Sequence, residues 1–266
     1  MSIALVTGCN KGIGFYIARG LCEKGYAVIM GCRDAAKAKE AESRIKTDFP
    51  GAVLHHVTVD LSKPSTVAAA AIEVKSTFGP AIDILVNNAG FAYKTDSTVP
   101  FHTQAEVSAA INYRATRAMC ESFAPLIKKG GRIVNVSSTA GTLSIIHGDA
   151  LKKRWLAADS GDDIDFLVGE FLAHTKTSDF EQLGWPASAY GVSKLANTTF
   201  TRVFGKAHPE IHIFACCPGW CRTDMSSQEG LKSAQEGADT PLWLATSSEC
   251  LNVIPQGGFA ADRKAI

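Results

Sequence analysis

The sequence has no long apolar run, no charged leader and no basic cluster. No stretch approaches the ~20 consecutive apolar residues of a transmembrane helix, so no membrane partner is expected. The chain passes from Met1 directly into Ile3 and Ala4 without the charged segment and cleavage site of a signal peptide, which predicts a cytoplasmic location. The formal net charge is only +1, and this excludes nucleic acid from the expected partners.

Paired metal-binding motifs are also missing. The eight cysteines are scattered and form no C-x-x-C pairs with histidine partners, so we predict reduced thiols and no metal site. No Pro/Gly/Ser-rich linker divides the 266 residues, and we therefore expect one domain spanning residues 1–266.

Short apolar runs alternate with longer amphipathic ones along the whole chain, which predicts βαβ units. We expect strands at residues 3–6, 27–31, 53–59, 82–86, 132–136 and 211–215, with a weak last strand at 258–260. Helices are expected at residues 13–23, 35–47, 66–77, 105–123, 189–206 and 234–245. The predicted fold class is α/β, a Rossmann-like doubly wound parallel sheet, in which ligands bind beyond the carboxyl ends of the strands.

A glycine-rich segment, T-G-C-N-K-G-I-G at residues 7–14, follows the first predicted strand. Glycines let the backbone approach a pyrophosphate, and the next helix offers free N–H groups at its positive end. Its place between the first strand and the first helix favours dinucleotide binding over a plain glycine turn, although the spacing departs from G-x-G-x-x-G. The expected cofactor contacts are Gly8, Asn10, Lys11, Gly12, Ile13 and Gly14.

The end of the second strand predicts which dinucleotide is bound. NAD-binding proteins usually carry an acid here for the ribose 2′-hydroxyl, whereas an arginine accommodates the 2′-phosphate of NADP. Cys32 stands in the acid's place, Arg33 follows it, and Lys11 offers a second cation, so we expect NADPH. Two alternatives stay open: both cations are solvated surface charges, or Asp34 serves as the acid.

Polar residues follow three further strands and open onto the same crevice. Asp60 ends the third strand, the segment N-N-A-G at residues 87–90 ends the fourth, and Ser137 and Ser138 end the fifth. The alternatives are that Asp60 is a helix N-cap and that the asparagines are turn formers.

Tyr190 and Lys194 are four residues apart in a predicted helix and therefore share one face. A neighbouring positive charge favours the phenolate and brings the tyrosine pKa down from ~10 toward neutrality. The pair is a candidate proton donor, but the same spacing arises by chance in many helices, so the other motifs must support it.

Taken in order, T-G-x-x-x-G-I-G, N-N-A-G, a strand-end serine, Y-x-x-x-K and C-P-G resemble the short-chain dehydrogenase/reductase family over nearly the whole chain. The resemblance implies that Ser138 binds the substrate carbonyl and Tyr190 donates a proton. Lys194 would bind the nicotinamide ribose and lower the tyrosine pKa, and Asn112 would support a water-linked proton relay. Ser137 is expected to be structural. Further implied cofactor contacts are Asp60, Leu61, Asn88, Pro218, Cys221, Arg222 and Thr223.

Tyr190 follows Ser138 by 52 residues, a gap far longer than is usual in the family. The insertion, about residues 141–186, carries apolar residues at helical spacing over residues 164–172, which predicts a helix packed against the body. With G-W-P at 184–186 and C-C-P-G-W at 216–220, it resembles the monomeric carbonyl reductases of animals. In those enzymes the insertion covers the helices through which relatives dimerise, so we expect a monomer.

The same resemblance implies a substrate pocket. Phe91 and Trp220 would form apolar walls for an aromatic or quinone-like carbonyl compound, unless either belongs to the core. Cys217 is either a thiol near bound glutathione or a buried apolar residue. A surface for glutathione adducts would map onto Tyr93, Lys94, Thr95 and Gln104.

The function implied is NADPH-dependent reduction of ketones, aldehydes or quinones to alcohols. A narrower reductase of steroids, prostaglandins or pteridine side chains is the alternative within enzymes. A catalytically idle NADP-binding regulator or a partner-binding scaffold on the same fold are alternatives from other classes. The presence of Ser138, Tyr190 and Lys194 favours an enzyme.

Overall fold

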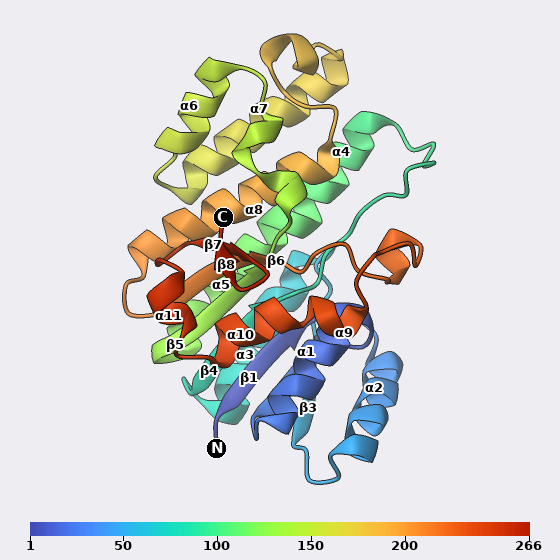
Figure 1. Cartoon of the computed structure of the whole chain (residues 1–266), viewed down its shortest axis with the longest axis vertical. Helices are drawn as coiled ribbons and strands as arrows, with labels where there is room; N and C mark the ends of the chain where they lie inside the picture. Colours follow the sequence, from blue (N-terminus) through green and yellow to red (C-terminus); the bar gives the residue numbers. More distant parts are fainter.

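One eight-stranded sheet runs through the molecule in the order β3-β2-β1-β4-β5-β6-β7-β8 (Figure 1). The computed structural model describes residues 1–266. All neighbouring strands are parallel except β7 and β8, which confirms the predicted doubly wound sheet. The strands are β1 (Ile3–Thr7), β2 (Ala27–Cys32), β3 (Leu54–Thr58), β4 (Ile82–Asn87), β5 (Ile127–Val136), β6 (His212–Cys217), β7 (Phe259–Ala261) and β8 (Lys264–Ala265).

Helices cover both faces of the sheet, because successive strand residues point to opposite sides. Leu5, Ile29 and Leu85 pack into the core beneath α3, α5 and α8, whereas their neighbours Val6 and Met30 pack beneath α1, α2 and α10. The α-helices are α1 (Gly12–Glu23), α2 (Ala35–Asp48), α3 (Pro64–Phe78), α4 (Phe101–Ala109), α5 (Ala115–Phe123), α6 (Asp149–Ala157), α7 (Gly161–Thr177), α8 (Ala189–Ala207), α9 (Ala234–Gly237), α10 (Asp239–Thr246) and α11 (Cys250–Val253).

The structure departs from the predicted elements in four places. The helix expected at 105–123 begins at Phe101, directly after Pro100, and contains a π-helical turn, η1 (Ala110–Arg114). The helix expected at 234–245 is divided at Ala238 into α9 and α10. Strand β5 begins at residue 127, because Gly130 has a positive φ of 75° and interrupts the apolar pattern without ending the strand. Strand β8 and helix α11 were not expected.

The insertion forms α6 and α7, which lie beyond α4 and α8 at the top of Figure 1. Helix α7 begins with a capping box in which Ser160 and Asp163 satisfy each other's backbone N–H groups. Ile164 and Phe171 are buried against the body, so the predicted amphipathic helix is confirmed. Tyr113 donates to the Gly161 carbonyl at 3.1 Å and anchors the start of α7 to η1.

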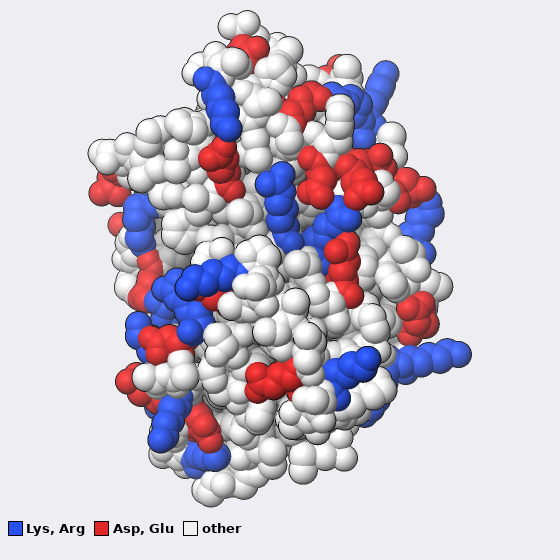
Figure 2. All heavy atoms as spheres, turned by 180° about the vertical axis from the view of Figure 1, so that it is seen from behind, with Lys and Arg blue, Asp and Glu red and all other residues white.

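The surface mixes both signs of charge. On the face shown in Figure 2, lysine and arginine side chains lie beside aspartate and glutamate side chains over most of the molecule. None of the helices combines the length and the apolar character needed to cross a membrane.

Candidate active site

The glycine loop is held against β4 by close backbone contact. Gly8 has a φ of 66°, and a Cβ at this position would lie 2.9 Å from the Cβ of Ala89. The Thr7 hydroxyl accepts hydrogen bonds from the N–H groups of Asn88 and Ala89, each at 3.0 Å. Helix α1 begins at Gly12 without a side-chain cap, so its first N–H groups are left available to an anion.

Asn88 has a positioning role that the sequence did not indicate. Its amide nitrogen donates to the Thr7 carbonyl at 3.0 Å and approaches the Gly8 carbonyl at 3.4 Å. A Cβ on Gly14 would lie 2.4 Å from this nitrogen and 2.4 Å from the Gly8 carbonyl oxygen, so only glycine fits at position 14. The ribose contact implied for Asn88 stays a prediction.

At the end of β2, Arg33 is exposed and makes no ion pair or hydrogen bond within the chain. Asp34 is the N-cap of α2: its carboxylate accepts from the backbone N–H of Lys37 at 3.1 Å. The carboxylate is therefore committed to the helix, which argues against Asp34 as the acid for a ribose hydroxyl. Arg33 is left as the free cation at this position.

Asp60 lies after β3 with Leu61 beside it and Arg33 close by. Its carboxylate accepts from the Ser62 hydroxyl at 2.7 Å, which lowers the carboxyl pKa, and the charge of Arg33 lowers it further. Helix α3 begins later and has Lys63 as its N-cap, so Asp60 is not the helix cap considered from the sequence.

Ser138 and Tyr190 are brought together by two glycines. A Cβ on Gly141 would lie 2.5 Å from the backbone nitrogen of Leu195, and one on Gly191 would lie 2.9 Å from the Ala140 carbonyl. The turn after β5 therefore packs directly on the start of α8, whose N-cap Ser188 accepts from Gly191 N at 3.0 Å.

Lys194 is buried, with 4% of its surface exposed. Its ammonium donates to the carbonyl of Val136, the last residue of β5, at 2.8 Å. Burial lowers the pKa of Lys194 to about 8. The lysine is thus fixed at the strand end, and its lowered pKa is close to neutral pH, so that a small rise in pH removes its charge.

The expected lowering of the Tyr190 pKa is wrong for this structure. Burial raises the pKa to about 12, and a hydrogen bond with the Ser138 hydroxyl opposes this only in part. The Lys194 ammonium lies over the phenol ring, 5.7 Å from its centroid, rather than at the phenolic oxygen. At neutral pH Tyr190 is therefore protonated and can donate a proton.

Asn112 lies in the π-helical turn η1, which interrupts the regular helix at a candidate functional residue. Its side-chain oxygen accepts from Phe91 N at 2.8 Å, and its amide nitrogen donates to the Ser193 hydroxyl at 3.0 Å. A Cβ on Gly90 would lie 3.2 Å from the Asn112 oxygen and 3.6 Å from the Lys194 ammonium. The four predicted catalytic residues, Asn112, Ser138, Tyr190 and Lys194, therefore meet around the carboxyl ends of β4 and β5.

A strap formed by Lys11, Asp224 and Lys94 ties the segment after β6 to the glycine loop and to the segment after β4. The Asp224 carboxylate pairs with Lys11 of the glycine loop at 2.5 Å, and the Asp224 carbonyl accepts from Lys94. Lys94 also donates to the Ser227 hydroxyl at 2.9 Å. Lys11 is thus paired within the chain and is not the free second cation expected from the sequence, and Lys94, expected at a glutathione-binding surface, is paired as well.

The residues expected over the nicotinamide end have different environments. Cys221 is buried, and a Cβ on Gly237 would lie 2.4 Å from its sulfur. Arg222 donates to the Leu231 carbonyl at 2.8 Å and holds its own loop. Thr223 lies against the glycine loop, 3.6 Å from the Cβ position of Gly12. Pro218 is half-buried at the turn after β6.

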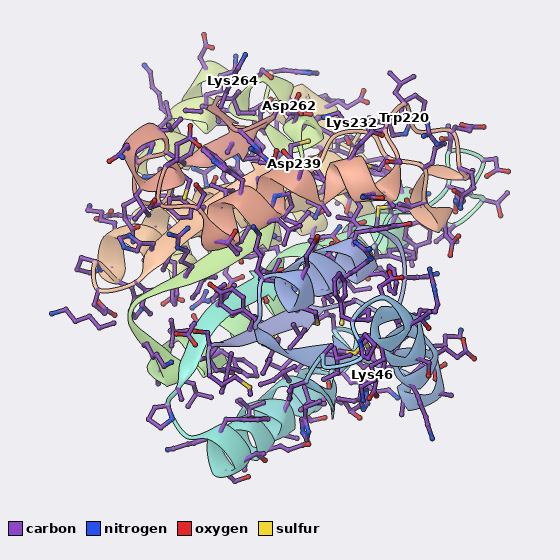
Figure 3. All side chains as sticks on the ribbon, turned by 60° about the horizontal axis from the view of Figure 1, so that its bottom comes forward. Lys46, Trp220, Lys232, Asp239, Asp262 and Lys264 are labelled. Atoms are coloured by element: carbon purple, nitrogen blue, oxygen red, sulfur yellow. The ribbon has the colours of Figure 1, made fainter.

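The residues expected to line the substrate pocket include aromatic side chains and polar side chains that are hydrogen-bonded within the chain. The rings of Phe91 and Tyr93 pack edge to face at 4.8 Å. Trp220 is 56% exposed beside Lys232 (Figure 3), so it is not a core residue. Gln104 is turned inward to the Val99 carbonyl at 2.8 Å.

Thr95 is exposed, whereas Cys217 is buried with its sulfur accepting from Gly219 N at 3.4 Å. The buried environment agrees with the apolar alternative for Cys217.

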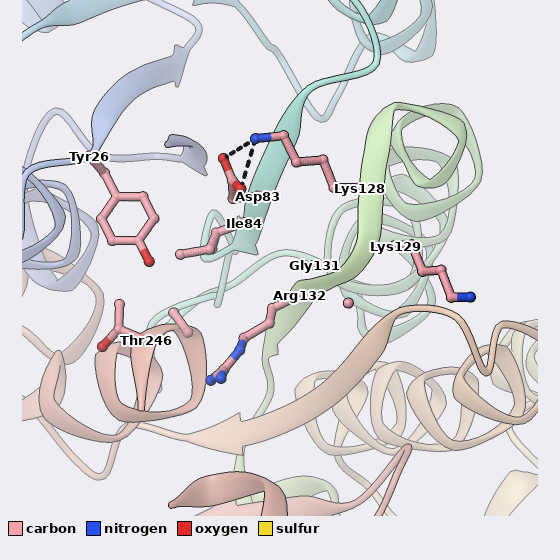
Figure 4. A pocket seen from close by; sticks show the side chains of 10 residues that line it. Tyr26, Asp83, Ile84, Lys128, Lys129, Gly131, Arg132 and Thr246 are labelled. Carbon is pink, nitrogen blue, oxygen red and sulfur yellow. Dashed lines mark hydrogen bonds and ion pairs between the residues drawn. The ribbon is translucent and has the colours of Figure 1, made fainter. Parts of the chain in front are cut away.

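A separate cavity of about 200 Å³ lies at the opposite, amino ends of the strands (Figure 4). Its lining includes Tyr26, Lys128 and Arg132, and the charge of Lys128 is neutralised by Asp83 at 2.9 Å. Arg132 donates to the carbonyls of α10 and the loop after it. None of the predicted site residues lies there.

Comparison with known proteins gives consistent matches. A model of the short chain dehydrogenase family matches residues 2–150. Carbonyl reductase (NADPH) 3 of Rattus norvegicus is 39% identical, covering 91% of this chain and 90% of that protein. Carbonyl reductase (NADPH) 1 of Bos taurus is 36% identical, covering 99% and 97%. The solved structure of salutaridine reductase from Papaver somniferum has a TM-score of 0.85 at 30% identity, covering 97% of this chain and 99% of that chain.

Proposed function

Because this chain belongs to the short-chain dehydrogenase family, we propose that it is an NADPH-dependent carbonyl reductase that converts ketones, aldehydes or quinones to alcohols. The observation that carries the proposal is the meeting of Ser138, Tyr190, Lys194 and Asn112 at the strand ends beside an open helix N-terminus. The named relatives reduce carbonyl groups with NADPH, and the donor set of this chain fits that chemistry.

The residues present fit a nicotinamide cofactor. The uncapped start of α1 would hold the pyrophosphate, and Arg33 would hold the 2′-phosphate. Bound NADPH would supply the hydride that reduces the carbonyl carbon. Asp34 is committed to capping α2, so its carboxylate does not compete with the phosphate for Arg33.

The chain's own groups would manage the proton and the developing negative charge. The Ser138 hydroxyl would donate a hydrogen bond to the carbonyl oxygen, where charge accumulates in the transition state. Tyr190 would transfer its proton to the same oxygen, and its raised pKa keeps that proton in place at neutral pH. Lys194 would hold the cofactor ribose, while Asn112 would keep the backbone at Phe91 in position.

We also propose a cytoplasmic monomer. Helix α7 packs on α4 and α8, the helices that would otherwise be available for pairing. Ion pairs from Arg117 of α5 to Asp162 at 3.0 Å and to Asp165 at 2.7 Å also hold α7 against the body. Sedimentation at two concentrations should give one species near 28.3 kDa, and a dimer stable to dilution would contradict the proposal.

The activity test measures NADPH oxidation with a panel of quinones, aromatic aldehydes and ketosteroids, compared by kcat/KM. We expect turnover of aromatic quinones and aldehydes, with Tyr190→Phe as the matched inactive control. Turnover confined to ketosteroids would favour the narrower reductase. NADPH binding seen by fluorescence without turnover of any compound would favour the idle regulator and overturn the proposal.

A further inference from the structure

Two thiols lie in contact beneath the cofactor-binding loop. The sulfur of Cys9, in the glycine loop, is 3.6 Å from the sulfur of Cys32, at the end of β2. The eight cysteines are all free, and this is the one pair whose sulfur atoms approach within hydrogen-bonding distance. Both side chains belong to the apolar core cluster on the α1 side of the sheet.

The position of the pair is fixed by the sheet. Strands β1 and β2 are parallel neighbours with Thr7 opposite Gly31, and Gly8 N continues the ladder by donating to the Gly31 carbonyl at 2.8 Å. Cys9 and Cys32 therefore follow two adjacent strand ends that are held in register. A disulfide has an S–S distance of about 2.05 Å, so the sulfurs need to approach by only about 1.5 Å to form a bond.

Cys32 differs chemically from the other buried cysteines, including Cys9, whose pKa is raised by its hydrogen bond with Cys32 and by burial. Hydrogen bonding from the Cys9 thiol and from the backbone N–H groups of Cys9 and Asn10 lowers the pKa of Cys32. Burial instead raises the pKa of Cys22 to about 11 and that of Cys120 to about 12. Since the thiolate is the nucleophile in thiol oxidation, Cys32 is the buried cysteine best prepared to react.

We propose that Cys9 and Cys32 form an oxidisable dithiol, a modification site that closes to a disulfide with a peroxide and weakens cofactor binding. The Cys32 sulfur attacks one peroxide oxygen as the O–O bond breaks, which gives a sulfenic acid and, with the thiol proton, one water. The Cys9 sulfur then attacks the Cys32 sulfur, and the hydroxide leaves with the Cys9 proton as a second water. The two thiols lose two electrons and two protons, and one peroxide becomes two waters.

Access for the oxidant requires local motion, because Cys9 is fully buried and Cys32 is only 2% exposed. Cys9 belongs to the glycine loop, and the residue after Cys32, Arg33, is exposed. A transient opening of this loop would admit a molecule as small as hydrogen peroxide. Oxidation should therefore be slower than that of a free thiol but should lead to one product.

The disulfide would act on the cofactor through the backbone. Drawing Cys9 toward Cys32 moves the N–H groups of residues 9 and 10, which belong to the loop proposed to receive the cofactor phosphates. This coupling rests on the proposed function, whereas formation of the disulfide does not. We expect the NADPH concentration for half-saturation to rise by about tenfold, the value of one hydrogen bond to a charged group.

The chemical test uses the full-length protein treated with hydrogen peroxide and digested with trypsin without reduction. Cleavage after Lys11, Arg19, Lys24 and Arg33 places Cys9 and Cys32 on separate peptides, residues 1–11 and 25–33, and Cys22 on a third, residues 20–24. We expect the first two peptides linked, and released by dithiothreitol. No linkage, overoxidation of both thiols, or a different cysteine pair would overturn the proposal.

Variants separate the pair from general oxidation. Cys9→Ala should prevent the linkage, whereas Cys22→Ala should retain it, and circular dichroism checks that both are folded. If a variant fails to fold, the peptide map of the oxidised wild-type protein still tests whether the disulfide forms.

The functional test compares reduced and oxidised protein in NADPH titrations. We expect an increase in KM for NADPH that dithiothreitol reverses and that Cys9→Ala does not show. Linkage with unchanged NADPH affinity would overturn the coupling. Linkage in a protein that does not oxidise NADPH with any carbonyl compound would contradict the proposed function while leaving the dithiol in place.

Discussion

The crevice has a cofactor half, around β1 and β2, and a catalytic half, around β5 and α8. The two halves are formed by different parts of the chain, one by backbone and the other by side chains. Around β1 and β2 the surface is formed by backbone, with Gly8 and Gly12 at positive φ and Gly14 without room for a side chain. Around β5 and α8 it is formed by buried polar side chains, including Asn112, which is 1% exposed, and Lys194. The cofactor half can let a ligand approach the backbone because side chains are absent. The catalytic half depends on particular polar side chains that are held in place.

The buried polar groups of the catalytic half form a continuous network. Asn87 donates to the Asn135 side chain at 2.8 Å, and Asn135 donates to Thr201 at 2.9 Å. Thr201 donates to the Asn197 carbonyl at 2.8 Å, and Asn197 donates to the Asn112 carbonyl at 2.9 Å. Removing one member would leave a partner unsatisfied, which typically costs about 1–3 kcal/mol. Replacing a buried polar residue should therefore cost more stability in the catalytic half than in the cofactor half.

The largest expected effect is on the catalytic half alone. Tyr190→Phe should reduce kcat by about 10²–10⁴, the usual contribution of a positioned general acid. NADPH affinity should remain near wild type, because the other half of the crevice is unchanged. Steady-state kinetics and fluorescence titration measure the two quantities. Retention of more than about a tenth of the activity would remove Tyr190 from the role of proton donor.

The pH dependence should follow Lys194. Its pKa is lowered to about 8, so it loses its proton, and its charge, as the pH rises through that value. If the charged lysine is required, kcat/KM should fall by about tenfold per pH unit above pH 8. Tyr190, with a pKa of about 12, stays protonated over this range and cannot cause the decrease. A profile that is flat from pH 7 to 10 would show that the charge is not needed.

Stability should change in the opposite direction. Because the folded pKa of Lys194 lies below the ordinary value, the unfolded chain binds more protons between about pH 8 and 10.5. Its contribution to stability should therefore rise with pH across that window. Lys194→Met should abolish activity yet raise the midpoint of thermal unfolding at pH 7, because no charge remains to be buried. A lower midpoint would contradict the interpretation of Lys194 as a costly charge.

The cofactor half should be broken by a single methyl group. In Gly14→Ala the new Cβ would overlap the Asn88 amide and the Gly8 carbonyl, which overpacks the loop by about 1–3 kcal/mol. We expect at least roughly tenfold weaker NADPH binding. Gly169→Ala is the matched control, since nothing lies within 4 Å of that Cβ in α7 and alanine favours a helix. Equal NADPH affinity in the two variants would show that the close approach is not required.

The smallest expected effect concerns the choice of cofactor. Arg33→Ala should reduce the preference for NADPH over NADH by about tenfold, because one exposed charge-assisted contact is lost. Lys11 should compensate little, since it already pairs with Asp224. The measurement is kcat/KM for both cofactors at low and high salt. If the ratio of kcat/KM for NADPH to that for NADH is unchanged, the 2′-phosphate must be bound by groups other than Arg33.

The difference between the halves explains what the sequence could predict. The glycine loop and the alternating strands are local patterns, so both could be placed from the order of residues. The commitment of Asp34 to α2, and the packing of Gly141 against α8, depend on side chains and turns meeting in space. The raised pKa of Tyr190 was missed for the same reason, because burial outweighs the neighbouring charge and residue spacing does not report burial.

The strap formed by Lys11, Asp224 and Lys94 bears on how long a cofactor stays bound. The Lys11 and Asp224 side chains are each 65% exposed, so their ion pair contributes at most about 1 kcal/mol and is weakened by salt. Such a contact opens readily and can delay departure of a ligand only a few-fold. Residence time should therefore shorten with ionic strength, and exchange of spent for fresh cofactor should not require any large rearrangement of the fold.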